Sequence, residues 1–124
     1  MNDNIYEQNI HRETMATTTN FIEYVYDQIR EAGEVSYKKM FGEYTIYCDG
    51  KIVALACDNQ LFVKPTASGR AALGDVVEAP PYPQAKPCFL IKDQLEDQQL
   101  ISKVIRLTAD ELPEPKPKKA KVNK

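Results

Sequence analysis

Apolar residues recur every three to four positions near the start of the chain and predict a helix over residues 20–32. Asn20 and Glu23 form a capping box at its first turn, and Gly33 supplies a left-handed residue to end it. The buried face of this helix is predicted to carry Ile22, Val25, Tyr26 and Ile29.

Alternating apolar and polar residues follow, and they predict three antiparallel strands over 35–48, 51–57 and 61–64. Gly42-Glu43 indicates a bulge or bend in the first strand. Asp49-Gly50 predicts a hairpin turn, because both residues tolerate the positive φ of a type I′ turn. If that register continues, one face of the sheet carries Tyr44, Ile46, Cys48, Val53, Leu55 and Cys57, and the other carries Ile52, Ala54 and Ala56.

The second half predicts a short helix from Thr66 to Gly74, a brief strand over 75–78 and another strand over 88–91. The prolines between 80 and 87 exclude regular structure there. Asp93 and Glu96 indicate a second capping box. The helix that it opens has one apolar stripe, made of Ile101, Val104, Ile105, Thr108 and Leu112, and is ended by Pro113.

The resulting order is α-β-β-β-α-β-β-α, which defines a two-layer α+β fold with an antiparallel sheet and the long helices on one face. With 124 residues, the chain fits one domain. We expect a loose N-terminal extension over 1–17, a folded domain over 18–112, and a disordered Lys/Pro tail over 113–124. Translation starting at Met15 instead of Met1 is an open alternative.

Charge is distributed unevenly along the chain. The net charge of −2 combines a tail of +4 over residues 113–124 with a body of −6. A dedicated duplex-DNA binder usually carries its positive charge on the folded surface, so this class is disfavoured. There is no apolar run of the roughly 18 residues that a membrane span needs, nor a secretory signal, so we expect a cytoplasmic protein without membrane contact.

The three cysteines, Cys48, Cys57 and Cys88, lack the spacing of a metal site. Across the Asp49-Gly50 turn, Cys57 lies about six residues, or roughly 20 Å, along the sheet from Cys48. A disulfide needs Cα atoms within about 7 Å, so this pair is not bridged and buried free thiols are predicted.

Several motifs resemble, in order, those of the N-terminal domain of the TfoX/Sxy competence regulators. They are Lys39-Met40-Phe41-Gly42-Glu43-Tyr44, Ile46-Tyr47, Asp49-Gly50-Lys51, Leu61-Phe62-Val63-Lys64, Pro80-Pro81-Tyr82-Pro83, Ala85-Lys86-Pro87 and Leu112-Pro113. The resemblance covers about residues 18–113 and implies a secretion-chaperone-like topology in a bacterial cytoplasmic protein connected with transcriptional control of DNA uptake. It implies no known catalytic residue. Full-length regulators carry a second domain, whereas here we expect a single-domain member. Glu43 and Thr45 stand where a glycine-rich variant of the family motif has glycines.

Groups suited to catalysis are sparse. His11, the only histidine, lies in the expected extension, so a histidine base has no anchored position. Phosphate-loop, dinucleotide and zinc motifs do not occur. We therefore expect no enzymatic activity, no catalytic residue, no metal and no cofactor.

Two kinds of binding surface are candidates. Tyrosines suit protein interfaces, and prolines pre-order the loop around one of them, which makes Tyr44, Tyr47 and Tyr82 a candidate partner surface. Packing of that loop over the sheet is an equal alternative. Basic residues with a helix N-terminus offer candidate anion or nucleic-acid contacts at Lys38, Lys39, Lys64, Thr66, Arg70 and Lys86. For Thr66, simple helix capping is the favoured interpretation.

The sequence thus predicts a non-enzymatic regulatory or protein-interaction module, acting in transcriptional control, as a monomer or homodimer with a protein partner. The alternative is a weak nucleic-acid-binding protein that uses scattered basic residues and the tail, whose lysines are Lys116, Lys118, Lys119, Lys121 and Lys124.

Overall fold

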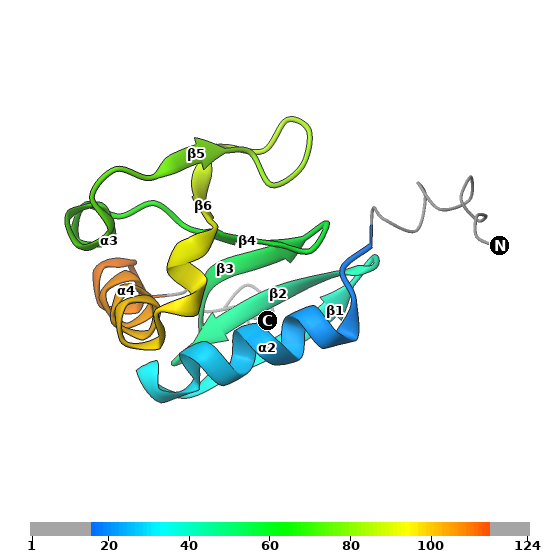
Figure 1. Cartoon of the computed structure of the whole chain (residues 1–124), viewed down its shortest axis with the longest axis horizontal. Coiled ribbons are helices and arrows are strands. Elements are labelled where there is room, and N and C mark those ends of the chain that lie inside the picture. Colours follow the sequence, from blue (N-terminus) through cyan, green and yellow to red (C-terminus); the bar gives the residue numbers. More distant parts are fainter. Residues whose placement is uncertain (1–15, 115–124) are drawn as a thin grey trace, which may run out of the picture.

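Residues 16–114, which the computed structural model describes, form one antiparallel sheet with helices on one side (Figure 1). The sheet order is β1-β2-β3-β4-β6-β5. This α+β architecture confirms the predicted fold class. The elements are α2 (Thr19–Ile29), the 3₁₀ turn η1 (Arg30–Ala32), β1 (Val35–Met40), β2 (Glu43–Cys48), β3 (Lys51–Cys57), β4 (Gln60–Val63), α3 (Ala67–Leu73), β5 (Val77–Ala79), β6 (Cys88–Ile91), the 3₁₀ turn η2 (Asp93–Glu96) and α4 (Gln98–Glu111).

Both long helices keep most of their predicted buried faces, although Tyr26 and Leu112 are only half-buried, and their caps differ from the prediction. Thr18 rather than Asn20 caps α2, because its side chain accepts a hydrogen bond from the Phe21 N–H at 3.1 Å. Asp97 caps α4 in the same way, and the predicted capping box at Asp93 lies instead in η2. The buried residues are Ile22, Val25 and Ile29 of α2 and Ile101, Val104, Ile105, Thr108 and Ala109 of α4.

Gly33 ends the first helical segment for a reason other than the predicted one. Its φ of 164° is extended, so the left-handed conformation is absent. A Cβ atom at this position would lie only 2.8 Å from the Arg106 guanidinium and 2.9 Å from both Asp49 and Cys48. Glycine is needed here because other side chains approach the backbone closely.

The predicted bend at Gly42 is a complete hairpin turn. Phe41 and Gly42 have φ of 54° and 82°, and they divide the predicted first strand into β1 and β2. The Asp49-Gly50 turn forms as predicted, with φ of 53° and 83°, and Asp58-Asn59 makes a third tight turn with φ of 54° and 56°. The structure therefore has four strands before α3, where the sequence predicted three.

A β-bulge overturns part of the predicted register between β2 and β3. Tyr47 pairs with Ile52 as predicted, but Ile46 then pairs with Ala54, so that Val53 is the extra residue. Because side chains alternate with a period of two, this shift exchanges the faces beyond it. Leu55 and Cys57 consequently lie on the opposite face from the predicted one, and Ala54 and Ala56 join the core beneath the helices.

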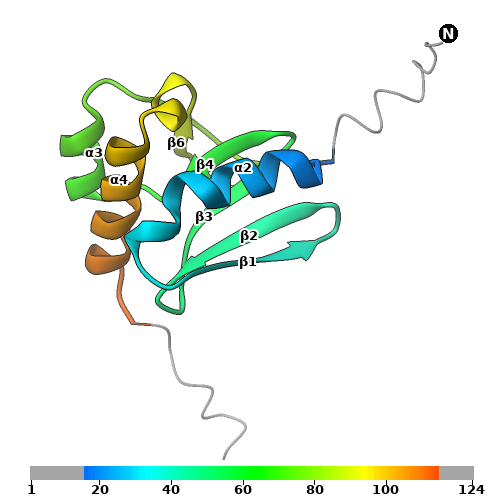
Figure 2. The same cartoon turned by 60° about the horizontal axis from the view of Figure 1, so that its bottom comes forward.

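The sheet thus has two different faces. The main core lies between the sheet and helices α2 and α4, which cover the same side (Figure 2). The other side, here called the helix-free face, carries a smaller apolar cluster made of Cys57, Phe62, Cys88 and Leu90. The loop between β5 and β6 lies on that side (Figure 1).

Thr17, which we assigned to the N-terminal extension, belongs to the folded part. It is buried, its N–H donates to the Gly42 carbonyl at 3.0 Å, and its hydroxyl bonds the Glu43 carboxylate at 2.6 Å. Residues 1–15, including His11, and residues 115–124 lie outside the described part, so the other domain boundaries stay predictions. None of the helices within residues 16–114 has the length and apolar character to cross a membrane.

Candidate docking surface

An apolar groove of about 410 Å³ opens between the β1–β2 hairpin, the helix-free face and the proline-rich loop. We call it the Phe41 groove. Its lining residues are Met40, Phe41, Glu43, Tyr44, Thr45, Leu55, Cys57, Pro81 and Tyr82. Leu55 and Cys57 form its floor because the bulge directs them to this face.

Phe41 is the most unusual residue of this groove. Its side chain is 97% exposed although it stands in a left-handed conformation with φ of 54°. The equivalent first positions of the other two tight turns, with nearly the same φ, are held by Asp49 and Asp58. This conformation is less unfavourable for aspartate than for phenylalanine, so Phe41 lowers stability while it buries almost nothing within the domain.

The opposite wall is formed by the loop over residues 80–87. Tyr82 is 56% exposed, and its carbonyl accepts a hydrogen bond from the Ala85 N–H at 3.1 Å, which closes a turn. The prolines fix φ along this loop and lower the entropy that a partner would have to remove. The sequence pattern had identified this wall, whereas Phe41 was missed. A Phe-Gly pair between two alternating segments, where Asn-Gly is usual, is the signal that could have found it.

The three predicted tyrosines do not form one surface. Tyr44 is buried, packs edge-to-face on Tyr37 with ring centroids 5.6 Å apart, and borders the Phe41 groove together with Tyr82. Tyr47 lies apart and lines a different groove. Tyr44 is therefore mainly a core residue.

The predicted anion site at the start of α3 is filled by a carboxylate of the chain itself. Thr66 accepts the Gly69 N–H at 3.0 Å, as the favoured capping interpretation required. The N–H groups of Ala67 and Ser68 donate to the Glu111 carboxylate, each at 2.9 Å. These bonds, with one from the Ser68 hydroxyl, hold the pKa of Glu111 below its ordinary value.

The candidate cations are scattered over the molecule. Arg70 pairs with Glu78 and stacks over Phe89, with 5.1 Å between its guanidinium carbon and the ring centroid. Lys38 and Lys39 are adjacent on β1 and so point to opposite faces. The remaining two are the half-buried Lys64, after β4, and the exposed Lys86, in the proline-rich loop.

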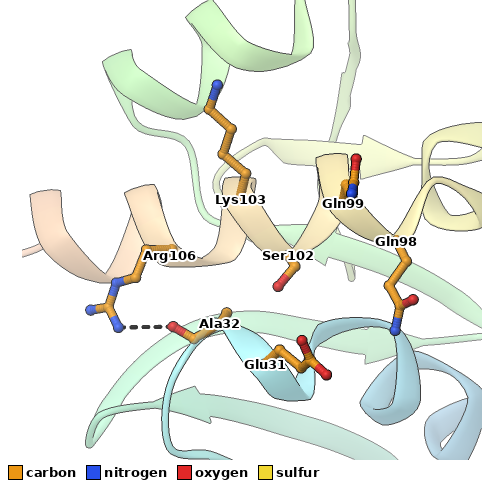
Figure 3. A pocket seen from close by; sticks show the side chains of 7 residues that line it. All are labelled: Glu31, Ala32, Gln98, Gln99, Ser102, Lys103 and Arg106. Atoms are coloured by element: carbon orange, nitrogen blue, oxygen red, sulfur yellow. Dashed lines mark hydrogen bonds between the residues drawn. The ribbon is translucent and has the colours of Figure 1, made fainter.

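A polar pocket of about 430 Å³ lies between η1 and α4 (Figure 3). Its Arg106 donates to the Ala32 carbonyl at 2.9 Å and pairs with Asp49 at 2.9 Å and Asp110 at 2.7 Å. Both carboxylates raise the pKa of Arg106. This guanidinium is thus engaged in holding α4 to the β2–β3 turn.

All three cysteines are buried and free, as predicted. Burial raises the pKa of each thiol, in the case of Cys57 to about 11, and the charge of Glu43 adds to that shift. A thiol with so high a pKa is a poor nucleophile at neutral pH. Within residues 16–114, the side chains of His, Cys, Asp and Glu form no group of three that could hold a metal ion.

The fold and the groove define a small α+β domain with one helix-covered sheet face and one face offering an apolar recess. The TfoX N-terminal domain model matches residues 27–112, so the chain belongs to the TfoX N-terminal domain family. It is also 39% identical over 107 residues, 86% of this chain and 93% of the relative, to an uncharacterized 12.7 kDa protein in the trpE 5′ region of Spirochaeta aurantia.

Proposed function

We propose that this protein is a non-enzymatic interaction module that docks an apolar segment of a partner protein in the Phe41 groove. The observation that carries the proposal is Phe41 itself. A residue that breaks a local conformational rule without a compensating contact inside the domain is expected at a functional site.

The chemistry of the groove supports this assignment. Met40 and Tyr82 are exposed by 45% and 56%, and with Phe41 they place three large side chains around a floor that is already apolar. Aromatic anchors in a central apolar recess are typical of interface hot spots. Burying one such side chain contributes about 1.5–3 kcal/mol, enough to offset the conformational cost at Phe41.

The biological setting of the proposal comes from the family. Membership of the TfoX N-terminal domain family supports a regulatory role, and we place the docking event in transcriptional control. In this proposal no bond of the partner is broken or formed. The domain contributes only a surface, whose occupancy changes what the partner does.

A photo-cross-linking experiment tests this function. Benzoylphenylalanine placed at Phe41, in cells that normally make the protein, should give a specific adduct with a protein. The matched control carries the same group at Tyr24, an aromatic residue of α2 that is 41% exposed. Equal adducts at both positions would contradict the proposal, and adducts only with nucleic acid would support the nucleic-acid alternative.

A further inference from the structure

β1 is an open edge of the sheet. The strand order places β1 at one end and β5 at the other. β5 has only three residues, whereas β1 has six, and all six pair with β2 without a break in register. Figure 2 shows β1 along the margin of the sheet, where no strand formed by residues 16–114 lies beyond it. The open edge is therefore a regular run of backbone about 20 Å long.

The pairing with β2 determines which backbone groups of β1 face outward. The Phe41-Gly42 turn has two residues, so Met40 and Glu43 form a hydrogen-bonded pair, and bonded and non-bonded pairs alternate from there. The Asp49 N–H donates to the Glu34 carbonyl at 3.0 Å, as this alternation requires. The residues whose N–H and C=O groups face outward are consequently Val35, Tyr37 and Lys39.

The side chains of β1 make this edge basic. Lys38 and Lys39 are both exposed, and β1 contains no acidic residue, although the whole chain has a net charge of −2. Lysines on an edge commonly protect it from pairing. The Lys38 ammonium, however, lies 5.8 Å from the centroid of the Tyr47 ring on β2, so this side chain leans inward and leaves the outer backbone uncovered. Two adjacent lysines then select among possible partner strands by charge.

A second copy of this chain is disfavoured as the occupant of the edge. Antiparallel pairing of β1 with another β1 would gather four lysines along one pair of strands, and like charges facing one another across strands are unfavourable. An acidic strand would instead place carboxylates beside Lys38 and Lys39, which is favourable. Charge complementarity therefore points to an acidic partner strand.

The Phe41 groove begins where this edge ends. Met40 is the last residue of β1 and, together with Phe41, it lines the groove. A segment that lies in the groove and continues past Met40 meets the outward groups of Lys39 next. Groove and edge are therefore parts of one continuous surface, which an extended segment can occupy along its whole length.

We propose that an acidic strand of the partner protein pairs antiparallel with β1 and extends the sheet. This inference rests on the function proposed above, because the same segment supplies the apolar residues that occupy the Phe41 groove. Next to those residues, two carboxylates lie opposite Lys39 and Lys38. Hydrogen bonds to the outward groups of β1 provide affinity, and the side chains provide specificity. Antiparallel pairing continues the pattern of the whole sheet.

NMR spectroscopy of the ¹⁵N-labelled full chain with a synthetic peptide tests this proposal. The probe is acetyl-Phe-Leu-Val-Glu-Glu-Ile-Thr-Val-amide. Its Val-Glu-Glu run lies opposite Met40, Lys39 and Lys38 in that order when the peptide pairs antiparallel with β1. The Phe-Leu pair before that run then reaches the Phe41 groove.

The expected result is an alternating pattern of protection from amide hydrogen exchange. At a free peptide concentration of about ten times Kd, the amides of Val35, Tyr37 and Lys39 should exchange about tenfold more slowly. The amides of Ser36 and Lys38, which already face β2, should change much less. This alternation distinguishes strand addition from a peptide that lies over a face of the sheet.

Two matched controls separate strand addition from simple charge attraction. N-methylation of the peptide at Ile, whose N–H faces β1, should abolish binding, whereas N-methylation at Thr, whose N–H faces away, should preserve it. Lys38→Gln/Lys39→Gln should weaken binding about fivefold. Lys92→Gln/Lys103→Gln removes the same charge from exposed positions elsewhere and should leave binding unchanged. Thermal melting verifies that each variant is folded.

Three results would overturn the proposal. The first is an absence of binding by the unmodified peptide at millimolar concentration and low salt. The second is equal binding by the two N-methylated peptides. The third is an equal loss of binding in the Lys38/Lys39 variant and its control.

Chemical shifts in the groove distinguish failure of this inference from failure of the proposed function. Shifts at Leu55 and Tyr82 without protection of β1 would overturn strand addition and leave docking in the Phe41 groove supported. Protection of β1 without shifts at Leu55 and Tyr82 would support strand addition and contradict docking in the groove. Both effects together would support both proposals.

Discussion

Replacing Phe41 by asparagine should stabilise the fold while removing the proposed docking anchor. A left-handed conformation costs an ordinary L-residue about 1–2 kcal/mol, and asparagine much less. Because the Phe41 side chain is 97% exposed, its removal forfeits almost no buried apolar area. The free energy of unfolding should consequently rise by about 1 kcal/mol, which for a domain of this size raises Tm by about 4–8 °C.

The reverse substitution provides the matched control. Asp58 occupies the same position of the β3–β4 turn, with φ of 54° and an exposed side chain. Asp58→Phe should therefore lower the free energy of unfolding by about 1 kcal/mol. Urea denaturation followed by circular dichroism measures both variants, and an unchanged dependence on denaturant would show that only stability has changed.

A loss of stability in Phe41→Asn would refute this reasoning, because it would show that the phenyl ring supports the fold. In that case Phe41 would be explained by packing, and the Phe41 groove would lose the observation on which its docking role depends. The Phe41→Asn variant can also carry benzoylphenylalanine at Tyr82 in place of Phe41. If this variant is more stable but no longer gives the adduct with the partner, the phenyl ring lowers stability and is needed for binding.

Three further predictions concern other parts of the molecule. Gly33→Ala should destabilise the fold by about 2 kcal/mol in urea denaturation, because its methyl group would overlap Arg106 and Asp49; a neutral result would mean that both side chains can move away. The lowered pKa of Glu111 means that its contact stabilises the fold above the ordinary value of 4.5 and is lost as pH falls through the folded pKa. Glu111→Gln should thus be less stable than the natural protein at pH 7 and equal to it near pH 2; a constant difference would disprove the ionic contact. With its pKa raised to about 11, Cys57 should react with iodoacetamide at pH 8 about a hundredfold more slowly than an unfolded thiol, as mass spectrometry of the alkylated peptide can measure; rapid labelling in the folded state would contradict its burial.

Local patterns in the sequence were sufficient for much of the fold. The helical period of α2 and α4, the Asp49-Gly50 turn and the irregular proline loop follow from backbone preferences that act over a few residues. The prediction that Cys48 and Cys57 are unbridged was correct, since even the shifted register leaves them far apart along the sheet. Family motifs pointed to the same architecture.

Tertiary structure decided the features that make the candidate sites. The bulge at Val53 depends on how β2 and β3 fit beneath the helices, and no local rule would have placed Leu55 in the Phe41 groove. The amides at the start of α3 were visible in the sequence, but their partner, Glu111, lies more than 40 residues away. Periodicity reports which face of an element is apolar; which distant side chains meet there is determined by packing. For this protein the sequence by itself determined most of the elements and the family, whereas the fold determined that Phe41 borders an apolar groove and that Tyr47 and Lys64 line another.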